Sequence, residues 1–382
     1  MYSWEQRKLS QITVRVTRKN GNQSDLPLTI SAQDGLVDQR KYFNRQVASR
    51  DMTNYYLIKK GEFAYNKSYS EGYPFGAVKR LDYYDIGALS TLYILFEITD
   101  KNISSDFLVS YYMTHLWYKE VSKRAAEGAR NHGLLNISTE DFFNSELNIP
   151  NSIEEQVKIG NLIKQFDKFI TLHQRKLNNL KLKKKALLQK LFPKNEERYP
   201  ELRFPGFTDA WEQRKFKDIA FKRGKISEAD LPYVEFEDIN SGIGTLNKNI
   251  SQKVGHKKGL LFEAGDVLFG KLRPYLQNWL LCQFAGIAVG DFWVLQPQNV
   301  SSAFLYYLIQ SEAYQSVANI SSGTKMPRSS WPLVSETLFS IPKYKEANMI
   351  GEFFLLIDRT ITLHQQEPFL CGNSVNGGVE LC

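Results

Sequence analysis

Apolar residues between positions 152 and 191 recur at alternating intervals of four and three, a heptad pattern that predicts one long helix. Ser152 and Glu155 can form a capping box at its start, and Pro193 ends it. At 1.5 Å per residue the helix would be about 60 Å long, so we expect it to pair with another helix; an ordinary long core helix is the alternative. The predicted seam consists of Ile159, Ile163, Phe166, Ile170, Leu177, Leu180, Leu187 and Leu191, with His173 and Lys184 completing the spacing.

The same seam begins again near the end of the chain, at Ile350, Phe354, Ile357 and Ile361. Pro368 follows soon after and lacks a backbone donor, so we expect the second helix to end near residue 365. The Gly- and Asn-rich residues 366–382 are predicted to be an irregular tail. Roughly 18 further residues would be needed to match the first helix, so we interpret the second helix as truncated.

Short strings repeat in the same order in the two halves of the chain. WEQRK occurs at 4–8 and 211–215, and ITLHQ at 170–174 and 361–365. Weaker matches lie between them, such as GEFAYNK at 61–67 with GDVLFGK at 265–271, and FLVSYY at 107–112 with FLYYL at 304–308. Repeated ends around diverged interiors predict two similar domains that do similar work with different specificities.

Alternating apolar runs bounded by turn residues predict strands inside each repeat, and periodic stretches near 104–126 and 301–319 predict helices. The fold class expected is therefore α+β, with mixed sheets and helices in two similar domains and a long helix after each. We predict domains at 1–150 and 211–342, helical regions at 151–210 and 343–365, and the tail at 366–382.

Lys and Arg outnumber Asp and Glu by 49 to 41 among 382 residues, a balance that permits a polyanionic partner without requiring one. Cys282, Cys371 and Cys382 show no paired spacing, which favours a reducing compartment. The N-terminal residues resemble no signal peptide, and the most apolar stretch, 278–290, is too short to span a bilayer. We expect a soluble cytoplasmic protein, with 278–290 forming one or two buried strands.

Cations and aromatic residues cluster at matched positions of the two repeats and are candidates for contacts with nucleic acid, because Arg and Lys suit phosphates and guanine edges and Asn suits adenine. A solvated surface of ordinary cations is the alternative, and the lysines at 181–185 are predicted to be the exposed face of the helix. The candidates are Lys67, Tyr69, Tyr73, Lys79 and Arg80, then Lys271, Arg273 and Tyr275, and finally Arg124, Arg130 and Asn131 with their counterparts Lys325, Arg328 and Ser329.

The sequence contains no GxxxxGK[ST] phosphate loop, no Gly-rich dinucleotide fingerprint, no HExxH and no GxSxG elbow. The five histidines are scattered, and two of them occupy the repeated seam position. We therefore predict a protein that holds no metal or cofactor and catalyses no reaction. A coiled-coil adaptor is the alternative that explains the helices, although it does not explain two diverged domains with matched basic positions.

The strings FPGFTDAWEQRK, IPNSIEEQVKIGNLIKQFDKFITLHQRKLNNLKLKKKALLQKLFP and IPKYKEANMIGEFFLLIDRTITLHQ resemble the specificity subunit of type I restriction–modification systems. The resemblance covers nearly the whole chain, apart from about the last seventeen residues. It implies two target-recognition domains, each reading one half of a bipartite double-stranded DNA site. It also implies that the long helices pack antiparallel as a spacer and dock two DNA-methyltransferase subunits, to which restriction subunits add.

The family's specificity subunit performs no chemistry, and S-adenosylmethionine and ATP are used by its partners, so the resemblance implies the same for this chain. The shortened second helix departs from the family pattern and affects the spacer and one docking surface. The short start before WEQRK and the unrelated tail are typical of a recombined or frameshifted variant. A silent or weakly assembling variant is therefore the second interpretation.

Overall fold

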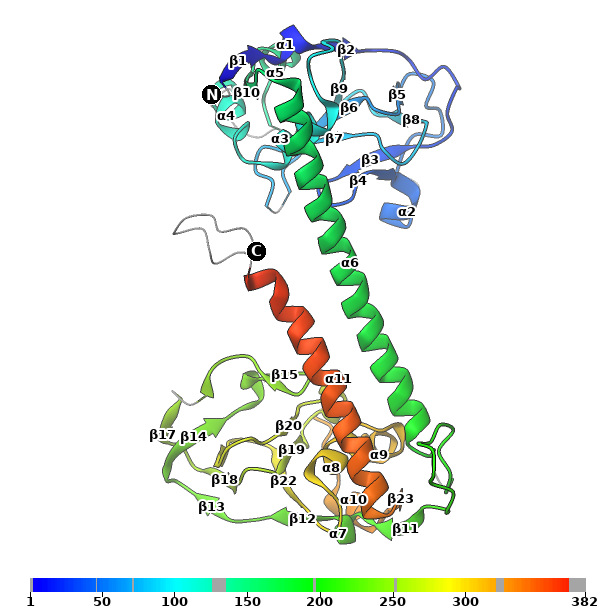
Figure 1. Cartoon of the computed structure of the whole chain (residues 1–382), viewed down its shortest axis with the longest axis vertical. Coiled ribbons are helices and arrows are strands. Elements are labelled where there is room, and N and C mark those ends of the chain that lie inside the picture. Colours follow the sequence, from blue (N-terminus) through cyan, green and yellow to red (C-terminus); the bar gives the residue numbers. More distant parts are fainter. Residues whose placement is uncertain are drawn as a thin grey trace. The chain divides into compact units, whose positions relative to one another are not determined.

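The computed structural model describes residues 3–45, 47–70, 72–125, 135–194, 197–250, 253–320 and 326–370. The chain divides into two compact units, residues 1–171 (unit 1) and 172–382 (unit 2) (Figure 1). The division falls inside helix α6 (Ile153–Leu191), whose first half packs on unit 1 and whose second half belongs to unit 2. The helix predicted over 152–191 is confirmed.

The first and last strands of unit 1 pair with each other: β1 (Trp4–Lys8) runs antiparallel to β10 (Glu146–Pro150). A four-stranded antiparallel sheet in the order β2-β9-β6-β7 forms its centre. The remaining strands form two antiparallel pairs, the hairpin β3-β4 and the non-sequential pair β5-β8. The further elements are α1 (Leu9–Ile12), β2 (Thr13–Val16), β3 (Leu28–Ser31), β4 (Gly35–Asp38), α2 (Gln39–Phe43), β5 (Tyr56–Lys59), β6 (Phe63–Asn66), β7 (Ala77–Arg80), β8 (Ile86–Leu89), β9 (Ile94–Ile98), α3 (Ser105–Met113), α4 (Tyr118–Arg124) and α5 (Thr139–Phe143).

Unit 2 repeats this plan. β11 (Glu212–Lys215) pairs with β23 (Leu338–Ile341), and a four-stranded sheet has the order β12-β22-β19-β20. A five-stranded sheet, β13-β18-β21-β14-β17, is added and contains one parallel pair. Its further elements are α7 (Phe216–Ile219), β12 (Ala220–Arg223), β13 (Ile226–Ser227), β14 (Asp230–Val234), η2 (Phe236–Asp238), β15 (Ile239–Asn240), β16 (Thr245–Leu246), β17 (Val254–His256), β18 (Gly259–Phe262), β19 (Val267–Gly270), η4 (Pro274–Leu276), β20 (Trp279–Leu281), β21 (Gly286–Ala288), β22 (Phe292–Pro297), α8 (Ser302–Leu308), α9 (Glu312–Ala318), α10 (Trp331–Glu336) and α11 (Tyr344–Leu370).

The repeat read from the sequence is therefore a structural repeat, and the α+β class is confirmed. Both copies of WEQRK are edge strands, and the GEFAYNK and GDVLFGK strings supply the equivalent sheet strands β6 and β19. Ser104 caps α3 and Ser301 caps α8 in the same way, each hydroxyl accepting from the backbone N–H three residues later. The residues 278–290 form two strands, β20 and β21, as predicted.

Close packing of a long helix on the N-terminus of a short one also recurs. A Cβ on Gly160 of α6 would lie 2.9 Å from the Phe107 backbone nitrogen at the start of α3. A Cβ on Gly351 of α11 would lie 2.7 Å from the equivalent nitrogen of Phe304 in α8. Each glycine therefore permits an approach that any side chain would prevent.

The helices predicted in the stretches 104–126 and 301–319 are confirmed, and each stretch contains two of them, α3 with α4 and α8 with α9. Thr114 and Ser311 turn the chain between the two helices with hydroxyl hydrogen bonds to the preceding turn. The prediction for the end of the second long helix was wrong. The second long helix continues to Leu370 rather than ending near 365. Pro368 lies in its last turn, where a missing donor removes one terminal hydrogen bond instead of interrupting the helix.

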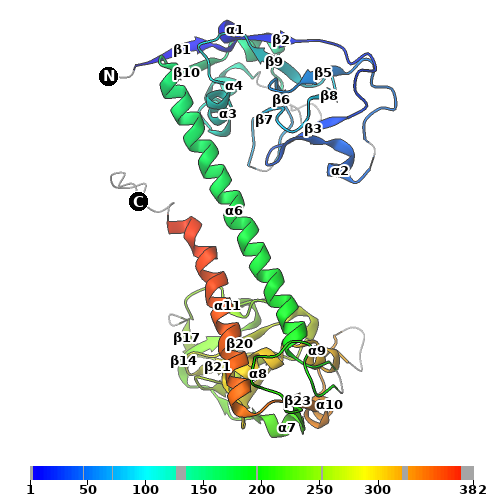
Figure 2. The same cartoon turned by 45° about the vertical axis from the view of Figure 1, so that its right-hand side comes forward.

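Within unit 2, α11 lies beside the second half of α6 and runs antiparallel to it (Figure 1, Figure 2). Between the two helices, Lys184 forms a salt bridge with Asp358, and the ring centroids of His173 and His364 lie 6.2 Å apart. These two histidines occupy equivalent positions of the sequence repeat, in the two copies of ITLHQ.

The predicted seam is covered unevenly. Its buried members are Leu191, Ile350, Phe354 and Ile361, and its half-buried members are Ile159, Ile163, Leu177, Leu180, Leu187 and Ile357. Phe166 and Ile170 are 51% and 52% exposed in the described part of the chain, so no described residue covers this part of the predicted seam fully.

Candidate nucleic-acid interface

A loop after β19 presents exposed polar and aromatic residues of unit 2. Arg273 and Gln277 both have left-handed backbones, with φ of 50° and 59°, and they bracket the 3-10 turn η4. Non-glycine residues adopt this conformation at a cost and are often found at functional sites. The guanidinium of Arg273 is exposed, and Tyr275 is 57% exposed. We call residues Lys271–Gln277 the reading loop.

Backbone hydrogen bonds join the reading loop to the segment that contains the predicted residues Arg328 and Ser329. The Arg273 N–H donates to the Pro327 carbonyl over 2.7 Å, and the Ser329 N–H donates to the Lys271 carbonyl over 2.9 Å. Leu272 and Arg328 form a β-bridge between them. The structure therefore brings together two groups of predicted residues that lie about fifty positions apart in the sequence.

The carboxylate of Asp291 pairs with two of the cations on this surface. Asp291 lies 3.4 Å from the Lys271 ammonium and 3.0 Å from the Arg328 guanidinium. Arg273, by contrast, makes no ion pair with any described residue. An exposed guanidinium on a rigid loop can donate two parallel hydrogen bonds to a phosphate or to a guanine edge.

Ser329 does not belong to this exposed surface. Its side chain is buried, and its hydroxyl donates to the Ala318 carbonyl over 2.6 Å. The Ser329 side chain, predicted as a DNA contact, is therefore engaged inside unit 2, where it holds the segment after residue 326. Arg130, Asn131 and Lys325 lie outside the described residues.

In unit 1 the predicted aromatic residues line a small cavity of about 280 Å³. Tyr69 and Tyr73 contribute one side, and Tyr42 of α2 adds a third phenol from far along the chain. The remaining polar groups are mostly uncharged and include Gln33, Asp34, Asn66, Ser68 and Ser70. Aromatic faces and amides suit stacking and base edges better than phosphates. Gln33, Tyr42 and Asn66 were not predicted from the sequence, because no local pattern marks them.

The predicted cations of unit 1 are mostly engaged in internal contacts. Arg80 is 14% exposed at its side chain and pairs with Asp82 at 2.7 Å and Asp106 at 2.9 Å, so it has a structural role that the sequence prediction missed. Lys79 is half-buried, and burial lowers the pKa of its ammonium. Lys67 lies 3.4 Å from the Ile137 carbonyl, and Arg124 pairs with Glu120 on α4.

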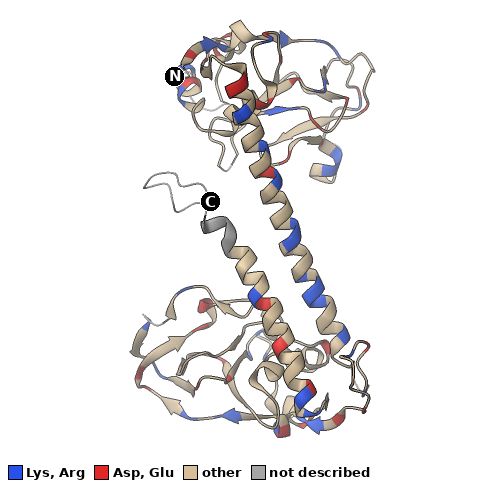
Figure 3. Ribbon diagram, in the orientation of Figure 1, with Lys and Arg blue, Asp and Glu red and all other residues tan. Residues whose placement is uncertain are grey.

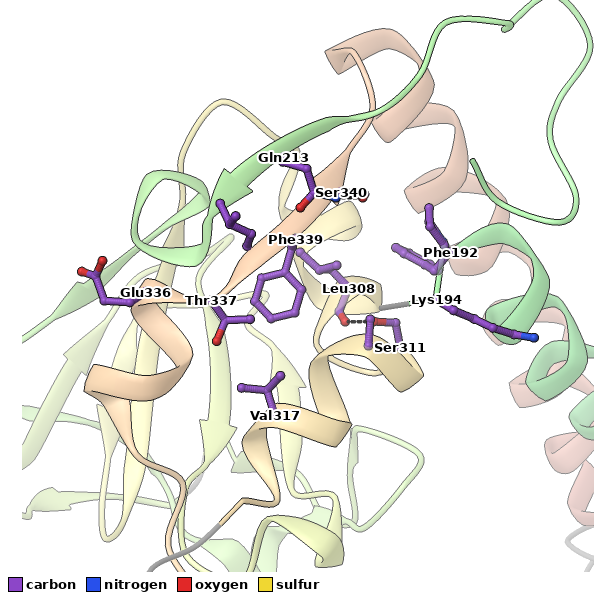
Figure 4. A pocket seen from close by; sticks show the side chains of 13 residues that line it. Phe192, Lys194, Gln213, Leu308, Ser311, Val317, Glu336, Thr337, Phe339 and Ser340 are labelled. Carbon is purple, nitrogen blue, oxygen red and sulfur yellow. Dashed lines mark hydrogen bonds between the residues drawn. The ribbon is translucent and has the colours of Figure 1, made fainter. Parts of the chain in front are cut away.

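A larger cavity of about 590 Å³ in unit 2 lies beside β11, β23 and α9 and has a mainly apolar wall (Figure 4). Its carboxylate, Glu336, accepts hydrogen bonds from Lys215 and Lys217, which lower its pKa to about 2. A carboxylate that stays ionised and doubly paired is a poor general acid. The hydroxyl of Ser311 donates to the Leu308 carbonyl and is not aligned with a base. This cavity therefore shows no catalytic arrangement among its lining residues.

No three His, Cys, Asp or Glu side chains of the described residues gather in a way that could hold a metal ion. No helix among these residues is long and apolar enough to cross a membrane.

Comparisons with known proteins agree with this geometry. Residues 39–182 match the family model described as the type I restriction modification DNA specificity domain. The type I restriction enzyme MjaVIII specificity subunit of Methanocaldococcus jannaschii is 22% identical over 310 residues, which cover 74% of this chain and 70% of that protein.

Solved structures show the same fold at low identity. The type I restriction–modification S subunit from M. genitalium has a TM-score of 0.54 at 14% identity, covering 96% of this chain and 92% of that one. A chain from a structure titled for complex assembly and conformational transition of the type I R-M system also has a TM-score of 0.54, at 13% identity, covering 95% and 92%.

Proposed function

We propose that this chain is a specificity subunit of a type I restriction–modification system, which recognises DNA for such a complex and catalyses no reaction itself; its similarity to the family model and to a curated specificity subunit supports this. Unit 1 would read one half of a bipartite double-stranded site, and unit 2 the other half. The observation that carries the proposal is the structural repeat. The sheets β2-β9-β6-β7 and β12-β22-β19-β20 are built alike, whereas the surfaces attached to them carry different sets of polar side chains.

That difference is what two readers with different targets require. Unit 1 offers a cavity of tyrosines and amides, and unit 2 offers a loop with exposed Arg273 and exposed Tyr275. A common frame with exchangeable surface chemistry lets each domain discriminate a different set of base edges. A coiled-coil adaptor would need the helices but not these two surfaces.

The helices α6 and α11 would connect the readers and dock two DNA-methyltransferase subunits, with restriction subunits added to them. The exposed Phe166 and Ile170 on α6 support a partner on this helix. S-adenosylmethionine and ATP would be bound by these partners rather than by this chain. Such a complex would act in the cytoplasm, where its DNA lies.

Methylome sequencing tests the proposal. Cells expressing this chain together with its methyltransferase partner should acquire one new bipartite motif, methylated in both halves. Cells expressing the partner with a variant that lacks residues 271–277 should lose it. A methylation pattern that is the same with and without this chain, despite its soluble expression, would contradict the proposal.

A further inference from the structure

A cavity of about 490 Å³ in unit 2 lies between the second half of α6 and the recognition domain. Lys181, Lys185 and Gln189 line it from the helix, and Gly242, Gln277 and Trp279 line it from the opposite wall. All of these residues lie within unit 2, so the cavity belongs to one compact body. Lys and Arg recur along this part of α6 (Figure 3).

The lysines of the cavity differ in how they are engaged. Lys184 is 12% exposed and lies 2.7 and 2.8 Å from the two carboxylate oxygens of Asp358, so its charge is matched internally. Lys181 and Lys185 are exposed and make no ion pair with any residue that the structure describes. Being four residues apart, they lie on one face of the helix. Glu312 is the remaining carboxylate of the lining, so the cavity carries a net positive charge.

The cavity continues directly from the reading loop. Gln277 closes that loop and also lines the cavity, and its carbonyl accepts the Gly242 N–H over 2.9 Å. A Cβ on Gly242 would lie 3.1 Å from the Gln277 amide oxygen, so the side chain rests against that wall. A DNA strand contacted by Arg273 and Tyr275 on one side of Gln277 can therefore extend its backbone to the lysines on the other side.

We propose that Lys181 and Lys185 bind backbone phosphates of the DNA next to the half-site that unit 2 reads. This rests on the proposed function and assigns to the helix a contact that the sequence pattern alone attributes to solvent. A duplex, whose major groove is already about 12 Å wide, is too large to enter the cavity. One strand's phosphates meet the lysines at its rim, and the contact adds affinity and orientation without sequence discrimination.

The test compares the full chain with two variants on the same helix. Lys181→Ala/Lys185→Ala removes both proposed contacts, whereas Lys183→Ala removes an exposed lysine that does not line the cavity. Affinity for a mixed-sequence duplex of about 40 base pairs is measured by fluorescence anisotropy between about 50 and 200 mM salt. Each lost phosphate contact reduces the log–log slope by about 0.9, so the double variant should lose about 1.8 and Lys183→Ala almost nothing.

The outcomes separate the two proposals. A shallow salt dependence of the unaltered chain would count against DNA recognition itself. A steep dependence that Lys181→Ala/Lys185→Ala and Lys183→Ala reduce equally would overturn the assignment to the cavity and leave DNA recognition intact. In a further arm, inorganic phosphate is titrated against thermal unfolding. If phosphate raises the Tm of the unaltered chain but not of the double variant, while all slopes stay equal, the cavity binds a free anion and the backbone assignment is wrong.

Discussion

Arg273 is the side chain of unit 2 best placed to read a base, because its backbone is fixed and its guanidinium is exposed. Arg273→Lys keeps the charge but removes the planar fork that pairs with guanine or phosphate at two points. We expect this variant to lose about 1–3 kcal/mol of affinity for the methylated motif over other sequences. Its salt dependence should stay nearly unchanged. Competition binding with motif and scrambled duplexes measures both quantities, and undiminished discrimination would exclude Arg273 as a reader.

Asp291 limits the positive charge of this surface, because its carboxylate pairs with both Lys271 and Arg328. Asp291→Asn retains the shape of the side chain and releases two cations toward the DNA. We therefore expect tighter binding to unrelated duplex and a salt slope that is steeper by up to about 1.8. The control is Asp230→Asn, which removes an exposed carboxylate that makes no ion pair with a described residue. Equal slopes for both variants would show that the two cations do not contact DNA.

Among the elements, the long helices depend on glycines at equivalent positions. Gly351→Ala places a methyl group 2.7 Å from the Phe304 nitrogen and 2.8 Å from the Ala303 Cβ, both in the fixed first turn of α8. Overpacking of this kind costs about 1–3 kcal/mol, more than the roughly 1 kcal/mol that alanine gains over glycine in a helix. The free energy of unfolding should therefore fall, as chemical denaturation of unit 2 would measure. Arg359→Ala, at an exposed position of the same helix, is the control and should change stability little.

The strand–helix junction of unit 2 gives a prediction about pH. Hydrogen bonds from Lys215 and Lys217 lower the pKa of Glu336 from 4.5 to about 2. A group with a lowered pKa in the folded state stabilises it above the unfolded pKa and stops doing so as pH falls through the folded value. The unaltered chain should thus exceed Glu336→Gln in stability above about pH 4.5, and the difference should shrink toward pH 2. A difference that is constant from pH 6 to about pH 2 would contradict the pairing.

Elements were more predictable from the sequence than the sites built on them. The seam spacing predicted α6, the apolar runs predicted β6 and β19, and the repeated strings predicted equivalent positions in two domains. The break after Met113 and the continuation of α11 through Pro368 depend on local hydrogen bonds at helix ends, which periodicity does not report. Charge alone did not distinguish the exposed Arg273 from Arg80, because only folding reveals that Arg80 faces two carboxylates.

At the scale of the whole molecule, each unit has its own core, yet α6 serves both. Leu191 and Phe192 at its end are buried in the core of unit 2 with Trp211, Phe304 and Phe354. The Phe192 ring lies 5.5 Å from Phe304 and 6.3 Å from Phe354. The helix is therefore part of the hydrophobic core of unit 2, and a domain boundary drawn at residue 211 from the sequence repeat omits these contacts.

Unit 2 should therefore need the end of α6 in order to fold stably. A fragment of residues 172–382 should fold cooperatively, because it contains the complete core of unit 2 and the Lys184–Asp358 pair. A fragment of residues 197–382 loses Leu191 and Phe192, and deleting large buried side chains costs about 2–5 kcal/mol each. We expect it to unfold at a much lower denaturant concentration or to aggregate. Circular dichroism during urea titration of both fragments measures the difference. Equal midpoints would show that unit 2 is complete without the end of α6, and that the helix only joins the two units.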